Sequence, residues 1–197
     1  MKFLKQYIEE KIDIDDVEWE QVASLFTKKT YMQGEEVYTA GEVNNHLYYV
    51  AKGVLRMYMI DTEGKEITWA LNYHKDGVVF DPFSGDYASY LTQKESDFFC
   101  EAMSDSVVYI TDFSKLDMLY ESALKWMKLG KIISDTHLVV VLERIKMMKS
   151  LTAKEKYILI KNVAPVYEQE LADYQFASVL GIAPQSLSRI KREMKDS

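Results

Sequence analysis

The stretch that decides the fold is DYQFASVLGIAPQSLSRIKR, residues 173–192. Apolar residues recur at helical spacing in two groups, Phe176, Ala177 and Leu180, then Leu187, Ile190 and, beyond the stretch, Met194. Gly181 lies between the groups; it has no Cβ and can take the left-handed conformation that ends a helix and turns the chain. Pro184 suits the first turn of a new helix, where no backbone N–H is needed. The stretch therefore predicts two short helices joined by a tight turn, with both apolar stripes facing inward.

The outward face of the second helix carries residue types that bind DNA. Gln and Arg make bidentate contacts to base edges, Ser is a compact donor or acceptor, and Lys and Arg hold phosphates. The predicted DNA-binding set is Gln185, Ser186, Ser188, Arg189, Lys191 and Arg192. Within it, Gln185 and Arg189 are the predicted base readers, because the N-terminal half of such a helix lies deepest in the major groove. The alternative is a helical hairpin with a solvated, charged surface.

Charge is divided unevenly along the chain, whose net charge is −7. Residues 1–143 carry 14 Lys and Arg against 25 Asp and Glu, whereas residues 144–197 carry 10 against 6. The last quarter of the chain is therefore basic although its body is acidic. We expect a surface that meets phosphates in this last quarter, and a solvated basic tail is the alternative.

Length and composition indicate a folded cytoplasmic protein without a membrane partner. With 197 residues, 48% of them hydrophobic, the chain can bury one large core or two modest ones. Its single cysteine, Cys100, allows no internal disulfide. No apolar run approaches the roughly 18 residues of a membrane span. The opening residues, MKFLKQYIEEKID, lack the apolar core and the small-residue cleavage site of a signal peptide.

Short strands are predicted in the first half of the chain. Alternating or β-rich runs occur at residues 30–38, 47–52, 54–60, 66–72, 78–80, 98–103 and 107–111. Turn signals separate them at residues 34, 41, 53, 61–64 and 76–77. Many short strands at close spacing predict an antiparallel sandwich or barrel. Before them, residues 3–27 show helical spacing and predict one or two short helices.

A long helix is predicted from about residue 122 to residue 149, with Gly130 as its only glycine. One stripe of the helix, spaced by threes and fours, is the predicted dimer interface: Leu129, Ile133, Thr136, Val140 and Met147. Other faces are apolar too, so the helix must be covered on more than one side, by its own strands and by the same helix of a second subunit. A monomer with a wholly buried helix is the alternative. Residues 150–152 then predict a break and a new helix cap.

Four motifs connect these elements to a known family. They are Gly41-Glu42, the run LYYVAKG at 47–53, the hairpin DTEGKE at 61–66, and Ala177-x-x-Leu180-Gly181 through Ser188-Arg189-Ile190. With them, nearly the whole chain resembles the Crp/Fnr family of bacterial transcription regulators. The resemblance implies an α+β fold: an N-terminal double-stranded β-helix, or β-roll, with flanking helices, a long dimerisation helix and a C-terminal helix-turn-helix domain. It divides the chain into an effector domain of the cyclic nucleotide-binding type at 1–121, a dimerisation helix at 122–150 and a DNA-binding domain at 151–197.

The resemblance also implies partners. A family member acts as a homodimer that presents two recognition helices to a palindromic site on double-stranded DNA. RNA polymerase and an unknown small-molecule effector are the further partners that it implies.

The family's cyclic-nucleotide binders hold the cyclic phosphate with a cassette, Gly-Glu-Leu and, further along, Arg-Ser or Arg-Thr. Counted without a gap, this chain has a degenerate cassette at Gly85, Asp86, Tyr87, Ser96 and Asp97. Ser cannot replace the bidentate, charge-assisted contact of Arg to phosphate, and Asp97 adds a negative charge. We therefore expect no response to cyclic AMP. The nearby aromatic residues line an apolar effector site or belong to the core: Tyr87, Tyr90, Phe98 and Phe99.

No cofactor, metal or catalytic residue is expected. An iron–sulfur site needs several cysteines, and His46, His74 and His137 have no ligand spacing. The chain has no His-x-His, Gly-x-Ser-x-Gly or Walker motif. Two alternatives stay open. One is a β-roll sensor that acts through protein contacts with a degenerate helix-turn-helix, since the sequence ends shortly after Arg192 without a wing; the other, less favoured, is a cupin-like metal enzyme.

Overall fold

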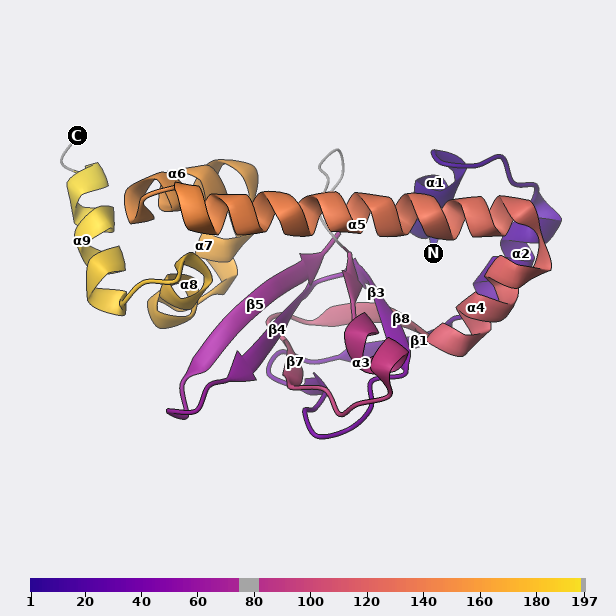
Figure 1. The fold of residues 1–197 in the computed structure, drawn as a ribbon, viewed down its shortest axis with the longest axis horizontal. Helices are drawn as coiled ribbons and strands as arrows, with labels where there is room; N and C mark the ends of the chain where they lie inside the picture. Colours follow the sequence, from indigo (N-terminus) through magenta and orange to yellow (C-terminus); the bar gives the residue numbers. More distant parts are fainter. Residues whose placement is uncertain (75–81, 196–197) are drawn as a thin grey trace.

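The computed structural model describes residues 1–74 and 82–195. Within them the helices are α1 (Lys2–Glu9), α2 (Asp16–Ser24), α3 (Tyr87–Thr92), α4 (Phe113–Ser122), α5 (Leu124–Ser150), α6 (Ala153–Val163), α7 (Val166–Glu170), α8 (Asp173–Leu180) and α9 (Pro184–Lys195). The strands are β1 (Thr27–Tyr31), β2 (Glu36–Tyr38), β3 (His46–Lys52), β4 (Val54–Ile60), β5 (Glu66–Tyr73), β6 (Phe83–Ser84), β7 (Phe98–Ala102) and β8 (Ser106–Asp112). Helix α5 runs the length of the molecule, with the strands along one side of it (Figure 1). Helices α1, α2 and α4 lie near one end of α5, and α6 to α9 lie near the other.

The strands form two four-stranded antiparallel sheets. Their orders are β1-β8-β3-β6 and β2-β7-β4-β5. Alternate side chains of the two sheets point toward one another and form a core that is buried almost completely. This central core contains Tyr31, Tyr48, Val50, Leu55, Cys100, Ala102 and Val108. The α+β fold with an antiparallel β-roll, expected from the sequence, is confirmed.

Local sequence signals predict most of these elements. Strand β4 has the predicted bounds, and α5 begins and ends within two residues of the predicted positions. The predicted run 30–38 is instead two strands, β1 and β2, on different sheets. Helices α3 and α7 and strand β6 were not predicted, each being very short. The predicted run 78–80 and the turn signal at 76–77 lie outside the described residues.

The break between α5 and α6 is the predicted cap. Leu151 leaves the helical conformation, and Thr152 begins α6 as its N-cap. The Glu155 backbone N–H donates to Thr152 Oγ1 at 3.3 Å, and the Thr152 backbone N–H donates to Glu155 Oε2 at 2.8 Å. This reciprocal capping box satisfies two donors that a helix start otherwise leaves open, so the chain can end one helix and begin another within two residues.

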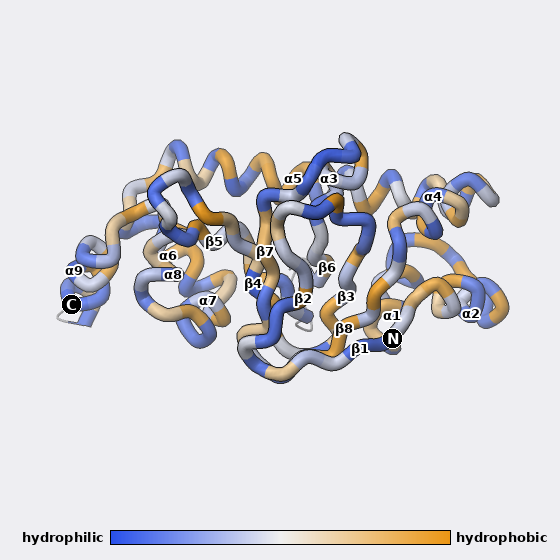
Figure 2. Tube along the Cα trace, turned by 90° about the horizontal axis from the view of Figure 1, so that it is seen from below, coloured by the Kyte–Doolittle hydropathy of each residue, from blue (hydrophilic) through white to orange (hydrophobic). Residues whose placement is uncertain are grey.

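Two further clusters of buried residues attach α5 to the rest of the chain. The N-terminal cluster joins α1, α4 and α5 to β3 through Leu4, Ile8, Tyr49, Leu119, Trp126 and Leu129. The C-terminal cluster joins the last helices to β4 and β5 and includes Val54, Leu71, Tyr157, Phe176, Ala177, Leu180, Leu187 and Ile190. Hydrophobic residues recur along α5 between hydrophilic ones, whereas α9 is mostly hydrophilic (Figure 2). The C-terminal cluster thus packs the last helices against the β-roll of their own chain.

Edge strand β5 also donates hydrogen bonds to side chains of these helices. The backbone N–H of Thr68 donates to Ser178 Oγ at 3.0 Å, and the backbone N–H of Leu71 donates to the Tyr167 hydroxyl at 3.2 Å. Because β5 is the last strand of its sheet, these two donors have no neighbouring strand to bond. Side chains of α7 and α8 take the place of that strand.

Candidate nucleic-acid interface and effector cavity

The turn between α8 and α9 has the geometry that the glycine predicts. Gly181 ends α8 with φ of 67°, in the left-handed region. The backbone N–H of Ile182 then donates to the Ala177 carbonyl at 3.0 Å, which closes the end of the helix. A Cβ at Gly181 would lie 2.9 Å from Met148 Cε of α5. The left-handed backbone favours glycine at this position, whereas the flexible end of Met148 could move aside for a Cβ.

Helix α9 buries one face and exposes the other. Leu187 and Ile190 are buried against α8, as predicted. Met194, predicted to face inward, is 36% exposed, so that prediction is wrong. The last turn of α9 extends beyond α8 (Figure 1), and the inward stripe ends one turn earlier than its spacing indicates.

Most of the predicted DNA-binding residues lie on the exposed face. Gln185, Ser188, Arg189 and Arg192 are exposed, and Ser186 is half-buried at its edge. Ser188 Oγ donates to the Pro184 carbonyl of its own helix at 3.2 Å. The Arg189 guanidinium lies 3.9 Å from Glu193 Oε1 one turn later, a loose pair in water. The exposed face of α9 is therefore a polar surface that carries two arginines, Arg189 and Arg192.

Lys191 occupies a different position from the one that the sequence predicts. Its Nζ donates to Asp173 Oδ1 at 2.6 Å and lies 3.7 Å from Glu168 Oε1. Partial burial lowers the pKa of Lys191. The hydrogen bond to Asp173 and the charge of that carboxylate raise the pKa by more, so the pKa lies above the ordinary value of a lysine. Lys191 therefore ties α9 to the start of α8 and to α7. The expectation that it is free to hold a phosphate is corrected: Arg192 and Lys195 are the exposed cations in this part of α9.

The predicted dimer stripe on α5 faces largely toward its own chain. Leu129 is 3% exposed inside the N-terminal cluster, where it cannot reach a second subunit. Ile133 and Met147 are half-buried against the N-terminal and C-terminal clusters. Thr136 and Val140 are exposed and line a cavity of the same chain. The outward surface of α5 instead carries exposed apolar residues at Leu138, Val139, Leu142 and Ile145.

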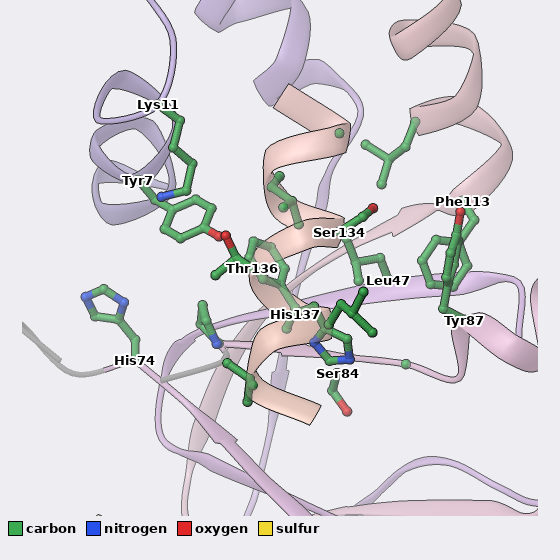
Figure 3. A pocket seen from close by; sticks show the side chains of 18 of the residues that line it. Tyr7, Lys11, Leu47, His74, Ser84, Tyr87, Phe113, Ser134, Thr136 and His137 are labelled. Atoms are coloured by element: carbon green, nitrogen blue, oxygen red, sulfur yellow. The ribbon is translucent and has the colours of Figure 1, made fainter. Parts of the chain in front are cut away.

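The cavity lies between α1, α5 and the β-roll and has a volume of about 670 Å³. Its apolar lining includes Phe3, Leu47, Phe83, Phe113, Leu116 and Val140. Polar side chains also reach it: Tyr7, Lys11, His74, Ser84, Tyr87, Thr136 and His137. In Figure 3, Lys11, Tyr7 and His74 lie at one end, and Tyr87 and Phe113 lie at the other. A volume of this size is that of a typical small-molecule site.

Only part of the degenerate cassette reaches this cavity. Gly85 and Tyr87 line it, whereas Asp86, Ser96 and Asp97 do not. Asp86 caps α3 by accepting from the Ser89 backbone N–H at 3.0 Å, and its other oxygen accepts from Ser96 Oγ at 2.8 Å. Ser96 is buried, and Asp97 is exposed. The segment is therefore closed by its own hydrogen bonds, and in residues 1–74 and 82–195 no Lys or Arg lines the cavity beside it.

The other residues named from the sequence are distributed over the molecule. Tyr90 and Phe113 stack with ring centroids 5.0 Å apart, and Phe98 and Phe99 pack on Trp69 of β5 and Tyr58 of β4 in their own sheet; of the four predicted aromatic residues only Tyr87 lines the cavity. His46 Nε2 lies 3.1 Å from Asp112 Oδ1. His74 and His137 both reach the cavity, as does Lys11. The sequence gives no sign of this, because the three residues come from distant segments that lack a shared motif.

The described part of the chain has neither a metal-binding cluster nor a membrane-spanning helix. Residues 1–74 and 82–195 contain no group of three or more His, Cys, Asp or Glu side chains placed to hold a metal ion. Over the same residues, no helix is both long and apolar enough to cross a membrane.

The sequence of this chain is similar to that of known proteins. Residues 28–123 match the model of the cyclic nucleotide-binding domain family. The chain is 24% identical over 172 residues to the nitrogen fixation regulation protein FixK of Rhizobium meliloti, covering 85% of this chain and 74% of that protein.

Solved structures share the fold over most of the chain. The c-di-GMP-responsive global regulator CLP of Xanthomonas campestris is 13% identical, with a TM-score of 0.67 and 92% of each chain covered. FixK2 of Bradyrhizobium japonicum is 18% identical, with a TM-score of 0.64 and coverage of 87% of this chain and 85% of that one. A protein of Eubacterium rectale assigned to the Crp/Fnr family is 16% identical, with a TM-score of 0.65 and coverage of 93% and 84%.

Residues 28–123 thus match the cyclic nucleotide-binding domain family, and the chain as a whole shares its fold with regulators that include a Crp/Fnr-family protein.

Proposed function

We propose that this protein is a transcription regulator that binds a palindromic DNA site as a homodimer, with residues 1–121, 122–150 and 151–197 as its effector, dimerisation and DNA-binding parts. The observation that carries the proposal is the exposed face of α9, where Gln185, Arg189 and Arg192 project from a helix positioned by the left-handed turn at Gly181. A helix presented in this way fits the major groove, which is wide enough to admit it. In this proposal RNA polymerase and a small-molecule effector are further partners.

The test is selection of binding sequences from random double-stranded DNA by the purified protein, followed by affinity measurements on the selected site. A palindromic consensus is expected. Arg189→Ala should lose about 1–3 kcal/mol of binding free energy on that site and relax the base preference at one position per half-site. Lys195→Ala is the matched control: it removes an exposed cation from the end of the same helix, and should weaken all sequences alike and flatten the salt dependence. Failure to select any sequence, or an Arg189→Ala variant that binds as tightly as wild type, would contradict the proposal.

The effector in this proposal is not a cyclic nucleotide. Asp86 and Ser96 bond to each other, and no Lys or Arg among the described residues lies on the cassette side of the cavity. A cyclic phosphate there would lose its water without gaining a cationic partner, at a cost of several kcal/mol. Isothermal titration calorimetry with cyclic AMP and cyclic GMP should therefore give no binding at physiological concentrations. Micromolar affinity for either nucleotide would contradict this prediction.

A further inference from the structure

The cavity between α1, α5 and the β-roll is chemically divided. Aromatic rings line it from several elements, with Phe83 lying 5.7 Å from the ring of Tyr7 and Phe113 lying 5.2 Å from that of Tyr87. Flat side chains of this kind bind a flat apolar body, because ring faces and edges pack against it at van der Waals distance. The aromatic lining therefore favours a ligand with an aromatic or alicyclic skeleton.

Charge is concentrated at the end of the cavity that α1 forms. Lys11 is the only Lys or Arg among the described residues that line the cavity, and its Nζ lies 3.5 Å from the centroid of the Tyr7 ring. His74, whose ring centroid lies 4.3 Å from that of Phe3 with the rings tilted by 30°, lies at the same end (Figure 3). Partial burial lowers the pKa of Lys11, because the ammonium gives up part of its water. A bound anion would attract the ammonium of Lys11 and so offset the hydration that the ammonium has lost.

The acidic residues of the cavity wall already have hydrogen-bond donors of their own. Asp117 Oδ2 accepts from the Tyr90 hydroxyl at 2.5 Å, and Glu10 Oε1 accepts from Gln6 Nε2 at 3.4 Å. The cassette segment, at the other side, is closed by the bond between Ser96 and Asp86. Among the described residues of the lining, Lys11 therefore offers an anionic head group its one cation, with the charge of Glu10 nearby, and this is not the position at which the cassette would hold a phosphate.

We propose that the effector of this protein is a small organic acid with a flat apolar body, whose carboxylate lies beside Lys11 and whose body packs between Phe83, Tyr87 and Phe113. The inference rests on the proposed role of the cavity as the effector site. A ligand in this position touches α1, the β-roll and Thr136 of α5 together. It would therefore bias how the long helix sits on the β-roll, which is the coupling that an effector needs.

The test uses two probes of equal shape and different charge, 2-naphthoic acid and the neutral 2-naphthalenemethanol, titrated into the full-length protein by calorimetry. Wild type should bind the acid about five- to tenfold more tightly than the alcohol, the value of one charge-assisted contact at a partly exposed site. Lys11→Met should abolish this difference and leave alcohol binding unchanged. Lys128→Met is the matched control, because Lys128 is an exposed lysine of α5 that does not line the cavity; it should behave as wild type.

A second variant, Ser134→Trp, places a large side chain at the cavity wall and should weaken both probes by at least about tenfold, whether or not charge is recognised. Wild type that binds neither probe, or binds both equally, would overturn the proposal, and so would a Lys11→Met variant that keeps the preference for the acid. The titrations contain no DNA. A failure to select a DNA site would therefore contradict the proposed function and leave the result on the ligand class intact. A failure to bind the probes would contradict the ligand class and leave the DNA-binding result intact.

Discussion

Cys100 shows how burial decides the chemistry of a single residue. Its side chain is fully buried in the central core, with Sγ lying 3.7 Å from Ser84 Oγ. Burial raises the pKa of the thiol to about 12, because the thiolate would lose its hydration between the two sheets. The reactive thiolate is therefore almost absent at neutral pH, and Cys100 acts as a small apolar residue.

Alkylation measures this directly. N-ethylmaleimide at pH 8 should leave Cys100 unmodified in the native protein and modify it completely in guanidinium chloride, as read by mass spectrometry. The sign follows from the raised pKa: reactivity in the folded protein should increase only as the pH rises toward 12. Rapid labelling of the native protein at pH 8 would show that the thiol is accessible and that a redox role has to be considered.

Individual residues also mark where reasoning from sequence alone stops. The exposed positions of Gln185, Arg189 and Arg192 follow from helical spacing, which needs nothing beyond the stretch itself. Lys191 lies on the same helix, but its partners Asp173 and Glu168 belong to α8 and α7, whose packing the spacing does not specify. Lys11 and His74 are more remote still, since they meet in a cavity only after α1 has packed on the β-roll.

Among the elements, α5 is the one whose pattern is most ambiguous. Its length and end are predictable from the absence of proline and from the capping box at Thr152, which is a local feature. Which stripe faces outward is not predictable, because several faces are apolar and only the packing of α1, α4 and the β-roll decides which are covered. Leu129 is thereby assigned to the core, and Leu142 to the surface.

This assignment changes the prediction for dimerisation. In the proposed homodimer, the exposed face with Leu138, Leu142 and Ile145 meets its counterpart, and such an interface should bury more than about 1,000 Å² in total. Leu142→Glu should weaken the dimer on the order of 100-fold or more, because it leaves an unpaired charge in an apolar contact. Light scattering across a concentration series measures the effect.

Leu91→Glu is the control for this experiment. Leu91 is exposed on α3 and is not part of the exposed face of α5, so the same substitution there should leave the dimer unchanged. A wild-type protein that is monomeric at micromolar concentration, or a Leu142→Glu variant that dimerises normally, would contradict the proposed interface.

At the scale of the whole molecule, the β-roll and the helix-turn-helix are connected by a continuous polar path. Buried Arg56 of β4 pairs at 2.7 Å with both Glu101 and Glu66, and its Nε donates to Thr68 Oγ1 at 3.0 Å. Thr68 in turn donates its backbone N–H to Ser178 of α8. Since a buried ion pair is costly to leave incomplete, this arrangement fixes β5 in the position that α8 requires.

Hydrogen exchange tests the contact. The amides of Thr68 and Leu71 should be protected in the native protein although β5 is an edge strand. Ser178→Ala should speed exchange at Thr68, and Tyr167→Phe should speed exchange at Leu71, each by about fivefold, which corresponds to the roughly 1 kcal/mol of one hydrogen bond.

Ser188→Ala removes an exposed hydroxyl of α9 and should change neither amide, which makes it the matched control. Unchanged exchange at Thr68 and Leu71 in both test variants would mean that the helices do not hold this strand in solution.

The position of α7 and α8 on β5 has a consequence for solubility as well. An uncovered edge strand is a template on which another chain can add its own strand, and the surface beside it here would include Val54 and Leu71. While the helix-turn-helix is seated, Ser178 and Tyr167 occupy the two backbone donors that such an addition would use first. The helices that position α9 for the proposed DNA contact thus also protect the chain from aggregation, and any movement that lifts α7 and α8 from the β-roll uncovers the edge strand.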